Sequence, residues 1–123
     1  MWEIKRTDEF HQWVQTVDDD VKEAIFKNLS ILKKIGPTLG RPFVDTIKGS
    51  SINNLKELRV QNKNRVIRVF FVFDPGRNIL LILGGNKKGN TRFYQEIVPQ
   101  VEKLYKIYLS KIGESDEKKN KTE

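Results

Sequence analysis

Residues 66–73 constrain the fold more than any other stretch of the sequence. They read VIRVFFVF, and every residue except Arg68 is apolar and either β-branched or aromatic. Such residues favour strands, and a strand without polar alternation is typical of the middle of a sheet that is covered on both faces. We therefore expect a sheet with other elements packed against both of its sides.

Apolar periodicity predicts two helices before this strand. Residues 2–6 alternate and indicate a short first strand. Thr7 is placed to cap a helix whose apolar residues recur at helical spacing up to residue 17. The acidic triplet 18–20 begins a second helix, and Gly36-Pro37 ends it. Two helices joined this tightly are expected to form an antiparallel hairpin.

The remaining elements predict an antiparallel meander followed by a helix. Residues 38–52 look irregular, and strands are expected over 55–60, 66–73 and 79–83. A short helical turn over 93–97 precedes a final helix that opens at Pro99. The order β-α-α-β-β-β-α predicts an α+β fold, with the first strand and the helical hairpin packed on a small, curved, mainly antiparallel sheet.

The length of 123 residues suits one domain, which we expect to span residues 1–112. The last eleven residues, GESDEKKNKTE, contain no apolar side chain. A segment of this kind cannot bury enough surface to fold, so a disordered charged tail is expected over residues 113–123.

Composition excludes several classes of protein. The chain has no cysteine, which excludes a disulfide framework or a thiolate metal site. The N-terminus MWEIKRTDEF carries charges where a signal peptide needs an apolar stretch, and no apolar run approaches the roughly 20 residues that span a bilayer. We expect a cytoplasmic protein that does not contact a membrane.

The positive charge of the chain is concentrated in its middle. Residues 41–92 hold 11 Lys and Arg against 3 Asp and Glu, a net charge of +8, while the whole chain carries +7. Such a concentration attracts polyanions. A basic surface without a partner is the simpler alternative.

The stretch 82–94, ILGGNKKGNTRFY, resembles a phosphate-binding loop but lacks its key residue. Gly84 and Gly89 have the spacing of G-x-x-x-x-G-K-[ST], but Asn90 stands where the lysine must be, which excludes a nucleotide loop. We expect the glycines to let the backbone approach the phosphate of a longer polyanion, with Lys87 and Lys88 beside it. The alternative for the two lysines is an ordinary solvated hairpin tip.

Metal and nucleophile chemistry has few candidates. His11 lies beside the apolar stripe of the first helix and is expected to be a packing or surface residue. The acidic triplet is better explained as the cap and first turn of a helix than as a metal site. A two-metal nuclease would need several converging carboxylates, so we expect neither a metal nor a cofactor.

Two arginines lie inside predicted strands. Arg59 points to the face opposite that of Leu58 and Val60, because residues of equal parity share a face. Arg68 interrupts the most apolar strand, where a charge is costly unless it is paired or faces a cleft. Both explanations stay open and are compatible, with Glu57 as the candidate partner.

A group of cations with a tyrosine suits RNA cleavage without metal. The 2′-hydroxyl of the substrate attacks the adjacent phosphate, and the protein must move protons and stabilise charge on phosphorus. Crowded cations lower the pKa of a lysine, an arginine fork holds phosphate oxygens, and a tyrosine can stack a base or carry a proton.

The motifs of residues 1–111 resemble those of the RelE/ParE superfamily of toxins from bacterial toxin–antitoxin systems, in its HigB-like, phage-related branch. The segments that carry the resemblance are IKG at 47–49, LKELR at 55–59, IRVF at 67–70, LGGNKKG at 83–89 and the aromatic pair at 93–94. The resemblance implies a RelE-like fold and a toxin that acts as an mRNA endoribonuclease, usually on the translating ribosome, and thereby inhibits translation. It also implies neutralisation by a cognate antitoxin, commonly a HigA-like protein with a helix-turn-helix.

The resemblance also implies the site residues. The catalytic group is expected to comprise Arg59, Arg68, Lys87, Lys88 and Tyr94. The residues expected to contact RNA are Lys48, Lys56, Arg65 and Arg92. We further expect the basic surface to be free of internal carboxylates and to be covered or distorted by the antitoxin.

Two other functions compete with this interpretation. One is a ParE-like toxin that inhibits DNA gyrase without cleaving nucleic acid, and the other is a non-catalytic RNA- or ribosome-binding module. The cationic group favours the ribonuclease, because gyrase inhibition does not require it.

Overall fold

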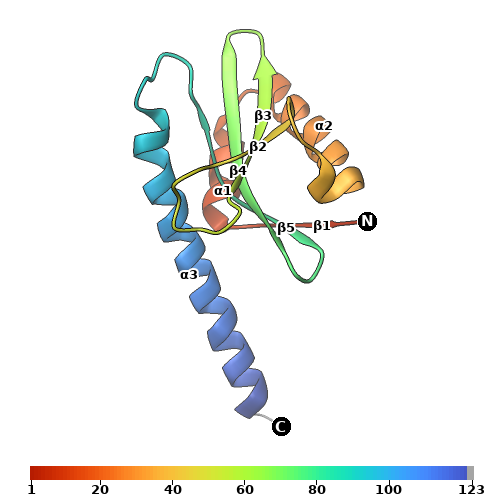
Figure 1. The fold of residues 1–123 in the computed structure, drawn as a ribbon, viewed down its shortest axis with the longest axis vertical. Coiled ribbons are helices and arrows are strands. Elements are labelled where there is room, and N and C mark those ends of the chain that lie inside the picture. Colours follow the sequence, from red (N-terminus) through yellow and green to blue (C-terminus); the bar gives the residue numbers. More distant parts are fainter. Residues whose placement is uncertain (122–123) are drawn as a thin grey trace.

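A five-stranded sheet forms the centre of the protein, whose computed structural model describes residues 1–121 and the side chains of residues 1–113 (Figure 1). The strands lie in the order β1-β5-β4-β3-β2; β1 runs parallel to β5 and the other neighbours are antiparallel. Their bounds are Glu3–Arg6 for β1, Val44–Thr46 for β2, Lys56–Asn62 for β3, Arg65–Asp74 for β4 and Asn78–Asn86 for β5. The apolar strand β4 is central, so the predicted α+β fold is confirmed.

A helical hairpin covers one face of the sheet. It consists of α1, Asp8–Thr16, and α2, Asp19–Ile35, and it packs on a core that includes Phe10, Leu58 and Val69. The predicted cap is confirmed: Thr7 Oγ1 accepts a hydrogen bond from the Phe10 N–H at 3.0 Å and donates one to the Ile82 carbonyl at 2.7 Å. We call this side of the sheet the hairpin face.

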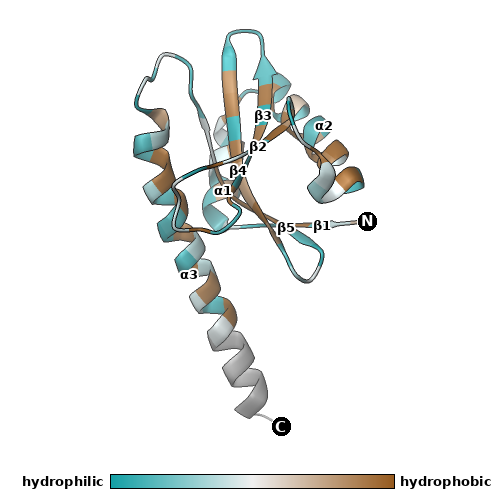
Figure 2. Ribbon diagram, viewed as in Figure 1, coloured by the Kyte–Doolittle hydropathy of each residue, from teal (hydrophilic) through white to brown (hydrophobic). Residues whose placement is uncertain are grey.

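The opposite side, which we call the α3 face, is covered by helix α3, Phe93–Lys121, and by the segment 47–55. Its core includes Phe70, Leu80, Ile97 and Val101. Figure 2 shows the apolar residues concentrated in the strands and on the inner sides of the helices, whereas the tip of the β3–β4 hairpin is hydrophilic. Both faces of β4 are therefore buried, as its sequence predicts.

The last helix differs from its prediction at both ends. A single helix begins at Phe93, and Pro99 lies inside it, rather than a short turn followed by a helix that opens at Pro99. Proline costs one backbone hydrogen bond there, and the burial of Phe93 and Ile97 against the sheet outweighs that loss. The helix also continues through residues 113–121, where a disordered tail was expected; the Glu and Lys residues of this segment favour a helix and no proline ends it. Residues 122–123 of that expected tail lie outside the described residues.

A short strand was also missed. β2 lies within residues 38–52, where no strand is expected from the sequence because three residues are too few to show alternation. It pairs with β3 through Val44–Leu58, Asp45–Glu57 and Thr46–Lys56. This pairing brings Asp45 beside the residues that form the site described below.

The two glycines of β5 are required for packing. A side chain at Gly84 would overlap the indole of Trp13, and one at Gly85 would crowd Phe93 and Ile97. At Gly84 and Gly85 the expectation that the glycines let the backbone approach a phosphate is wrong, because side chains of α1 and α3 cover these positions. At Gly89, where nothing lies within 4 Å of an added Cβ atom, the expectation stays a prediction.

Among residues 1–121, no helix combines the length and the apolar character that a membrane-spanning segment needs.

Candidate functional site

A row of charged residues crosses the sheet on its α3 face. Arg59 of β3 lies directly opposite Arg68 of β4, which in turn lies opposite Gly85 of β5. Like charges in opposed positions repel each other and destabilise a sheet. Glu57, two residues before Arg59 and therefore on the same face, supplies the opposite charge.

Glu57 is a buried carboxylate with three partners. Only 2% of the residue is exposed. Its Oε1 accepts a hydrogen bond from Arg59 Nε at 3.2 Å, and its Oε2 lies 3.6 Å from Arg68 Nε. Oε2 also accepts a hydrogen bond from the Tyr94 hydroxyl at 2.7 Å. The predicted salt bridge between Arg68 and Glu57 is thereby confirmed, and the carboxylate ties three elements together.

Tyr94 reaches this group from the first turn of α3. Its hydroxyl also accepts a hydrogen bond from Arg68 Nε at 3.4 Å, and the Lys87 ammonium lies 5.2 Å from the centre of its ring. Burial and the hydrogen bond to Glu57 raise the pKa of the Tyr94 hydroxyl, and Arg68 offsets part of that effect. Tyr94 therefore keeps its proton at neutral pH.

Asp45 supports Arg59 from the edge of the sheet. Asp45 Oδ2 lies 3.1 Å from Arg59 Nη2 and 2.9 Å from Arg41 Nη2. The hydrogen bond from Arg41, together with one from the Thr46 backbone, holds the pKa of the Asp45 carboxyl below its usual value. Two carboxylates therefore fix the guanidinium of Arg59, which is a third exposed, with a side-chain exposure of 34%.

An open cleft of about 630 Å³ lies over this group. Its lining residues are Asp45, Thr46, Ile47, Lys48, Gly49, Glu57, Arg59, Lys87, Tyr94, Gln95, Val98, Pro99 and Glu102. The cleft thus joins the edge of the sheet, the segment after β2 and the first turns of α3.

The cleft brings together only some of the predicted residues. Arg59, Lys87, Tyr94 and the predicted RNA contact Lys48 line it. Arg68 lies outside the lining, with a side-chain exposure of 11%, and acts on the cleft through Glu57 and Tyr94. Lys88 and Arg92 are exposed in the loop that follows β5 and do not line the cleft.

Lys56 and Arg65 belong to the other face of the sheet. Strand alternation puts Lys56 with Leu58 and Arg65 with Ile67, both of which pack on the hairpin face. Lys56 Nζ donates to Thr46 Oγ1 at 2.8 Å. Arg65 forms ion pairs with Asp18 and Asp20 at the start of α2.

The expectation that the basic surface is free of carboxylates is wrong. Glu57 and Asp45 neutralise much of the charge of Arg59 and Arg68. Asp45 is the site residue that sequence reasoning missed. Glu57 was expected as a partner of Arg68, but its contacts with Arg59 and Tyr94 were not, although the motif LKELR already puts Glu57 and Arg59 on one face. Within residues 1–113, the cations Lys48, Lys87, Lys88 and Arg92 form no ion pair.

His11 and the acidic triplet at residues 18–20 lie outside the cleft, on helices α1 and α2. His11 Nε2 lies 3.0 Å from Gln15 Nε2 on the same helix. Asp18 is the N-cap position of α2, and Asp19 and Asp20 lie in its first turn, as predicted. In the described part of the chain, no three His, Cys, Asp or Glu side chains are grouped so that they could hold a metal ion.

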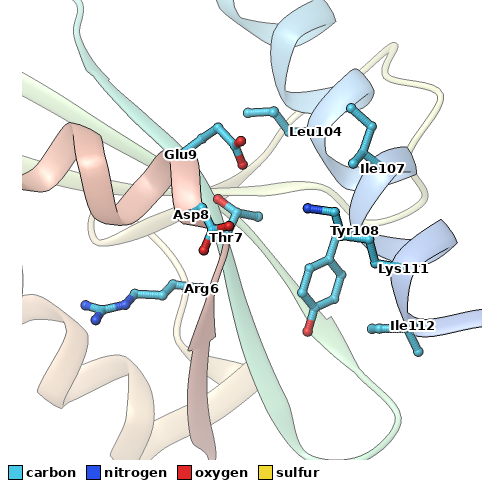
Figure 3. A pocket seen from close by; sticks show the side chains of 9 residues that line it. All are labelled: Arg6, Thr7, Asp8, Glu9, Leu104, Ile107, Tyr108, Lys111 and Ile112. Atoms are coloured by element: carbon cyan, nitrogen blue, oxygen red, sulfur yellow. The ribbon is translucent and has the colours of Figure 1, made fainter. Parts of the chain in front are cut away.

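A second cavity, of about 300 Å³, lies elsewhere, between the start of α1 and the middle of α3 (Figure 3). Residues 6–9 form one side, and Leu104, Ile107, Tyr108, Lys111 and Ile112 form the other. It contains none of the residues that surround Glu57.

Residues 12–106 match the family described as "Phage derived protein Gp49-like (DUF891)". Two relatives come from Mycobacterium tuberculosis and are named as toxins. The chain is 33% identical to HigB2 over 111 residues, which are 89% of the chain but only 55% of HigB2, so it spans about half the length of that relative. It is 36% identical to HigB3 over 100 residues, 80% of the chain and 86% of HigB3.

Solved structures share the fold at low sequence identity. The isolated RelE toxin of Escherichia coli aligns over 82% of the chain and 99% of its own length, with a TM-score of 0.59 and 12% identity. RelE in the archaeal RelE–RelB complex of Pyrococcus horikoshii aligns over 73% and 98%, with a TM-score of 0.57 and 15% identity. Together these matches show that the chain has the fold of the RelE toxins and belongs to the phage-derived Gp49-like family, with HigB toxins among its relatives.

Proposed function

We propose that the protein is the toxin of a toxin–antitoxin pair and cleaves mRNA, on the translating ribosome, without a metal ion. The observation that carries this proposal is the cleft in which Arg59, Lys87 and Tyr94 surround the buried carboxylate of Glu57. Family membership supports it, since HigB2 and HigB3 are named as toxins. The proposal places the protein in the cytoplasm, where the ribosomes are.

The cleft supplies groups for charge stabilisation. When the 2′-hydroxyl attacks phosphorus, negative charge grows on the phosphate oxygens. Arg59 Nη1 is not used by either of the carboxylates that hold the guanidinium, so it remains a donor for phosphate. Lys87, at the end of β5, adds a second positive charge without an ion pair among residues 1–113.

Tyr94 supplies the proton that the leaving oxygen needs, and the proton of the attacking 2′-hydroxyl passes to water in the open cleft. The raised pKa keeps the hydroxyl protonated at neutral pH, so Tyr94 has a proton to donate and cannot act as a general base. Glu57 and Arg68 fix the hydroxyl from two sides. Arg68 is therefore a positioning residue that orients Tyr94 and Glu57, and it is not proposed to contact the substrate.

The proposed partner is a cognate antitoxin, and a helix-turn-helix protein of the HigA type fits the family. One structural neighbour, the archaeal RelE, was solved as a complex with RelB. Among the predicted site residues, the paired arginines leave Lys48, Lys87, Lys88 and Arg92 available to an acidic antitoxin segment.

The test is inducible expression of the chain in bacterial cells, followed by mapping of mRNA 5′ ends. We expect growth arrest and new 5′ ends inside coding sequences, and both should disappear when the antitoxin is co-expressed. Growth arrest with intact mRNA and a loss of DNA supercoiling would overturn the proposal in favour of a gyrase inhibitor. If expression caused neither growth arrest nor mRNA cleavage, the protein would have no toxin activity and the proposal would be overturned.

A further inference from the structure

We propose that the part of the cleft formed by Glu102 and the segment 47–51 binds a nucleobase next to the cut and selects bases that carry an exocyclic amino group. This inference rests on the proposed function and adds a specificity-determining residue to it. Glu102 lies about one turn of α3 after Pro99 and lines the same cleft as Arg59, Lys87 and Tyr94.

The carboxylate of Glu102 is held in a fixed position by one of its oxygens. Glu102 Oε2 accepts hydrogen bonds from Ser50 Oγ at 2.8 Å and from the Ser51 backbone N–H at 2.7 Å. These two bonds, the backbone one first, lower the pKa of the Glu102 carboxyl, so the group is an acceptor at neutral pH. Oε1 accepts none of the hydrogen bonds formed among residues 1–113.

A free carboxylate oxygen restricts what this part of the cleft can bind. It repels phosphate, and its favourable partner is an N–H or O–H donor. Adenine, cytosine and guanine each carry an exocyclic amino group and uracil carries none. Where cytosine presents N4–H2, uracil presents the O4 carbonyl, and its only base-edge N–H donor is the ring N3–H. Glutamate and aspartate are the side chains that accept from such amino groups. The acceptor at Glu102 therefore favours amino-bearing bases over uracil.

The surroundings of Glu102 suit a flat base. Ile47, Val98 and Pro99 line the cleft together with it and provide apolar surface for the face of a ring. The volume of about 630 Å³ falls within the range of roughly 300–1,000 Å³ that is usual for small-ligand sites. With phosphate at Arg59 and Lys87, a base attached to it has both an apolar surface and an acceptor.

A purely structural role for Glu102 is the competing explanation, because the residue also ties segment 47–51 to α3. Two variants separate these roles. In Glu102→Gln the amide oxygen still accepts from Ser50 and Ser51, while the free acceptor becomes an NH2 donor. In Ser50→Ala the hydrogen bond from Ser50 Oγ to Glu102 is lost, while Glu102 Oε1 remains a free acceptor.

The direct test compares binding of 3′-CMP and 3′-UMP to the purified protein by NMR titration. These nucleotides have the same charge and nearly the same shape. They differ at the exocyclic group that Glu102 is proposed to recognise, N4–H2 against O4, and at the adjacent N3, which is an acceptor in cytosine and an N–H donor in uracil. We expect wild type to bind 3′-CMP at least about five-fold more tightly, the lower end of the discrimination that one good base contact provides. The Glu102→Gln protein should prefer 3′-UMP, and the Ser50→Ala protein should keep the wild-type preference.

Equal affinities of wild type for the two nucleotides would overturn the inference, as would a preference that Glu102→Gln leaves unchanged. An equal loss of preference in Ser50→Ala would assign the effect to the position of the segment and would also overturn it. Mapped 5′ ends report on cleavage separately. A protein that binds 3′-CMP selectively but cuts no mRNA keeps the subsite and loses the proposed ribonuclease function.

Discussion

At the scale of single residues, one carboxylate organises the site. Arg59 and Arg68 lie opposite each other on neighbouring strands, an arrangement that is unfavourable without a counter-charge. Glu57 contacts both guanidinium groups and the hydroxyl of Tyr94 while almost fully buried. The geometry of the cleft therefore depends on a residue that need not touch the substrate.

Replacement of Glu57 by alanine is expected to destabilise the protein strongly. The change leaves two opposed arginines without their shared partner, and breaking a buried ion pair costs about 3 kcal/mol or more. Urea denaturation of the purified variant measures the loss. Asp45→Asn is the matched control, since Asp45 is more exposed, with a side-chain exposure of 25%, and should cost much less. Equal effects of the two variants would contradict the central role of Glu57.

Replacement of Tyr94 by phenylalanine is expected to abolish cleavage and to leave the fold intact. The ring keeps its contacts with Phe70 and Phe93, and only the hydroxyl is lost. A general acid contributes roughly 10²–10⁴-fold to rate, so single-turnover cleavage of ribosome-bound mRNA should slow by at least about 10²-fold. Thermal melting checks that the variant is folded. A folded variant with wild-type rates would remove Tyr94 from the proton transfer.

At the scale of helices and strands, the sequence predicted an element correctly wherever the residues of that element alone decide its structure. The Thr7 cap, the positive φ of 77° at Gly36 and the apolar strand β4 all follow from neighbouring residues. Strand β2 was missed because its pairing with β3 joins segments that are distant in sequence. The start of α3 before Pro99 was missed because the burial of Phe93 and Ile97 depends on how the sheet folds.

The same distinction holds for the site. Alternation within a strand predicts that Arg59 shares a face with Glu57, and it also separates Arg65 from Arg68, which lie three positions apart. Alternation alone would therefore have excluded Arg65 from the predicted RNA contacts. The approach of Glu102 to Ser50 and Ser51 joins α3 to a loop, and no local pattern in the sequence indicates it.

Strand β5 is expected to tolerate no side chain at Gly84. Its added methyl group in Gly84→Ala would overlap Trp13, and overpacking of this kind costs about 1–3 kcal/mol. Gly40→Ala is the control, because nothing lies within 4 Å of the added atom. Chemical denaturation of both variants compares them. A Gly84→Ala protein as stable as Gly40→Ala would show that Trp13 moves aside without cost.

The end of α3 is expected to be dispensable. Residues 113–123 contain no apolar side chain and carry more acidic than basic groups, so their deletion should leave toxicity unchanged. A longer deletion, of residues 104–123, removes Leu104, Tyr105 and Tyr108, which pack against the α3-face core, and should prevent stable folding. Growth assays and solubility of the two truncated proteins give the result. Loss of toxicity in the shorter deletion alone would assign a function to the last eleven residues.

At the scale of the whole molecule, the distribution of charge matters more than its total. The net charge is +7, but Arg59, Arg65 and Arg68 are held by carboxylates of the protein itself. The cations without ion pairs among residues 1–113 include Lys87 and Lys88, which follow β5, and Lys48, which lines the cleft. Contacts with RNA phosphate should therefore come from the free Nη1 of Arg59 and a few loop lysines, and not from the basic residues in general.

The salt dependence of RNA binding tests this distribution directly. Each phosphate contact releases condensed counterions, so the slope of log affinity against log salt counts the contacts that are made. Replacing Lys87 and Lys88 by alanine should reduce the slope by roughly 1–2, because both cations lie in a loop and form no ion pair with the side chains described up to residue 113. Arg65→Ala removes one charge from the other face of the sheet, where Asp18 and Asp20 already hold it, and should leave the slope unchanged.

Fluorescence titrations of a short single-stranded RNA between low and physiological salt provide the slopes. The three full-length proteins compared are the wild type, the double lysine variant and Arg65→Ala. Because both variants are less positive than the wild type, the comparison controls for net charge. If the slope fell equally per charge removed in all of them, binding would follow the total charge of the molecule, and the proposed RNA path past Lys87 would be wrong. A reduction confined to the lysine variant places the phosphate backbone at the end of β5, beside the tyrosine proposed to donate the proton.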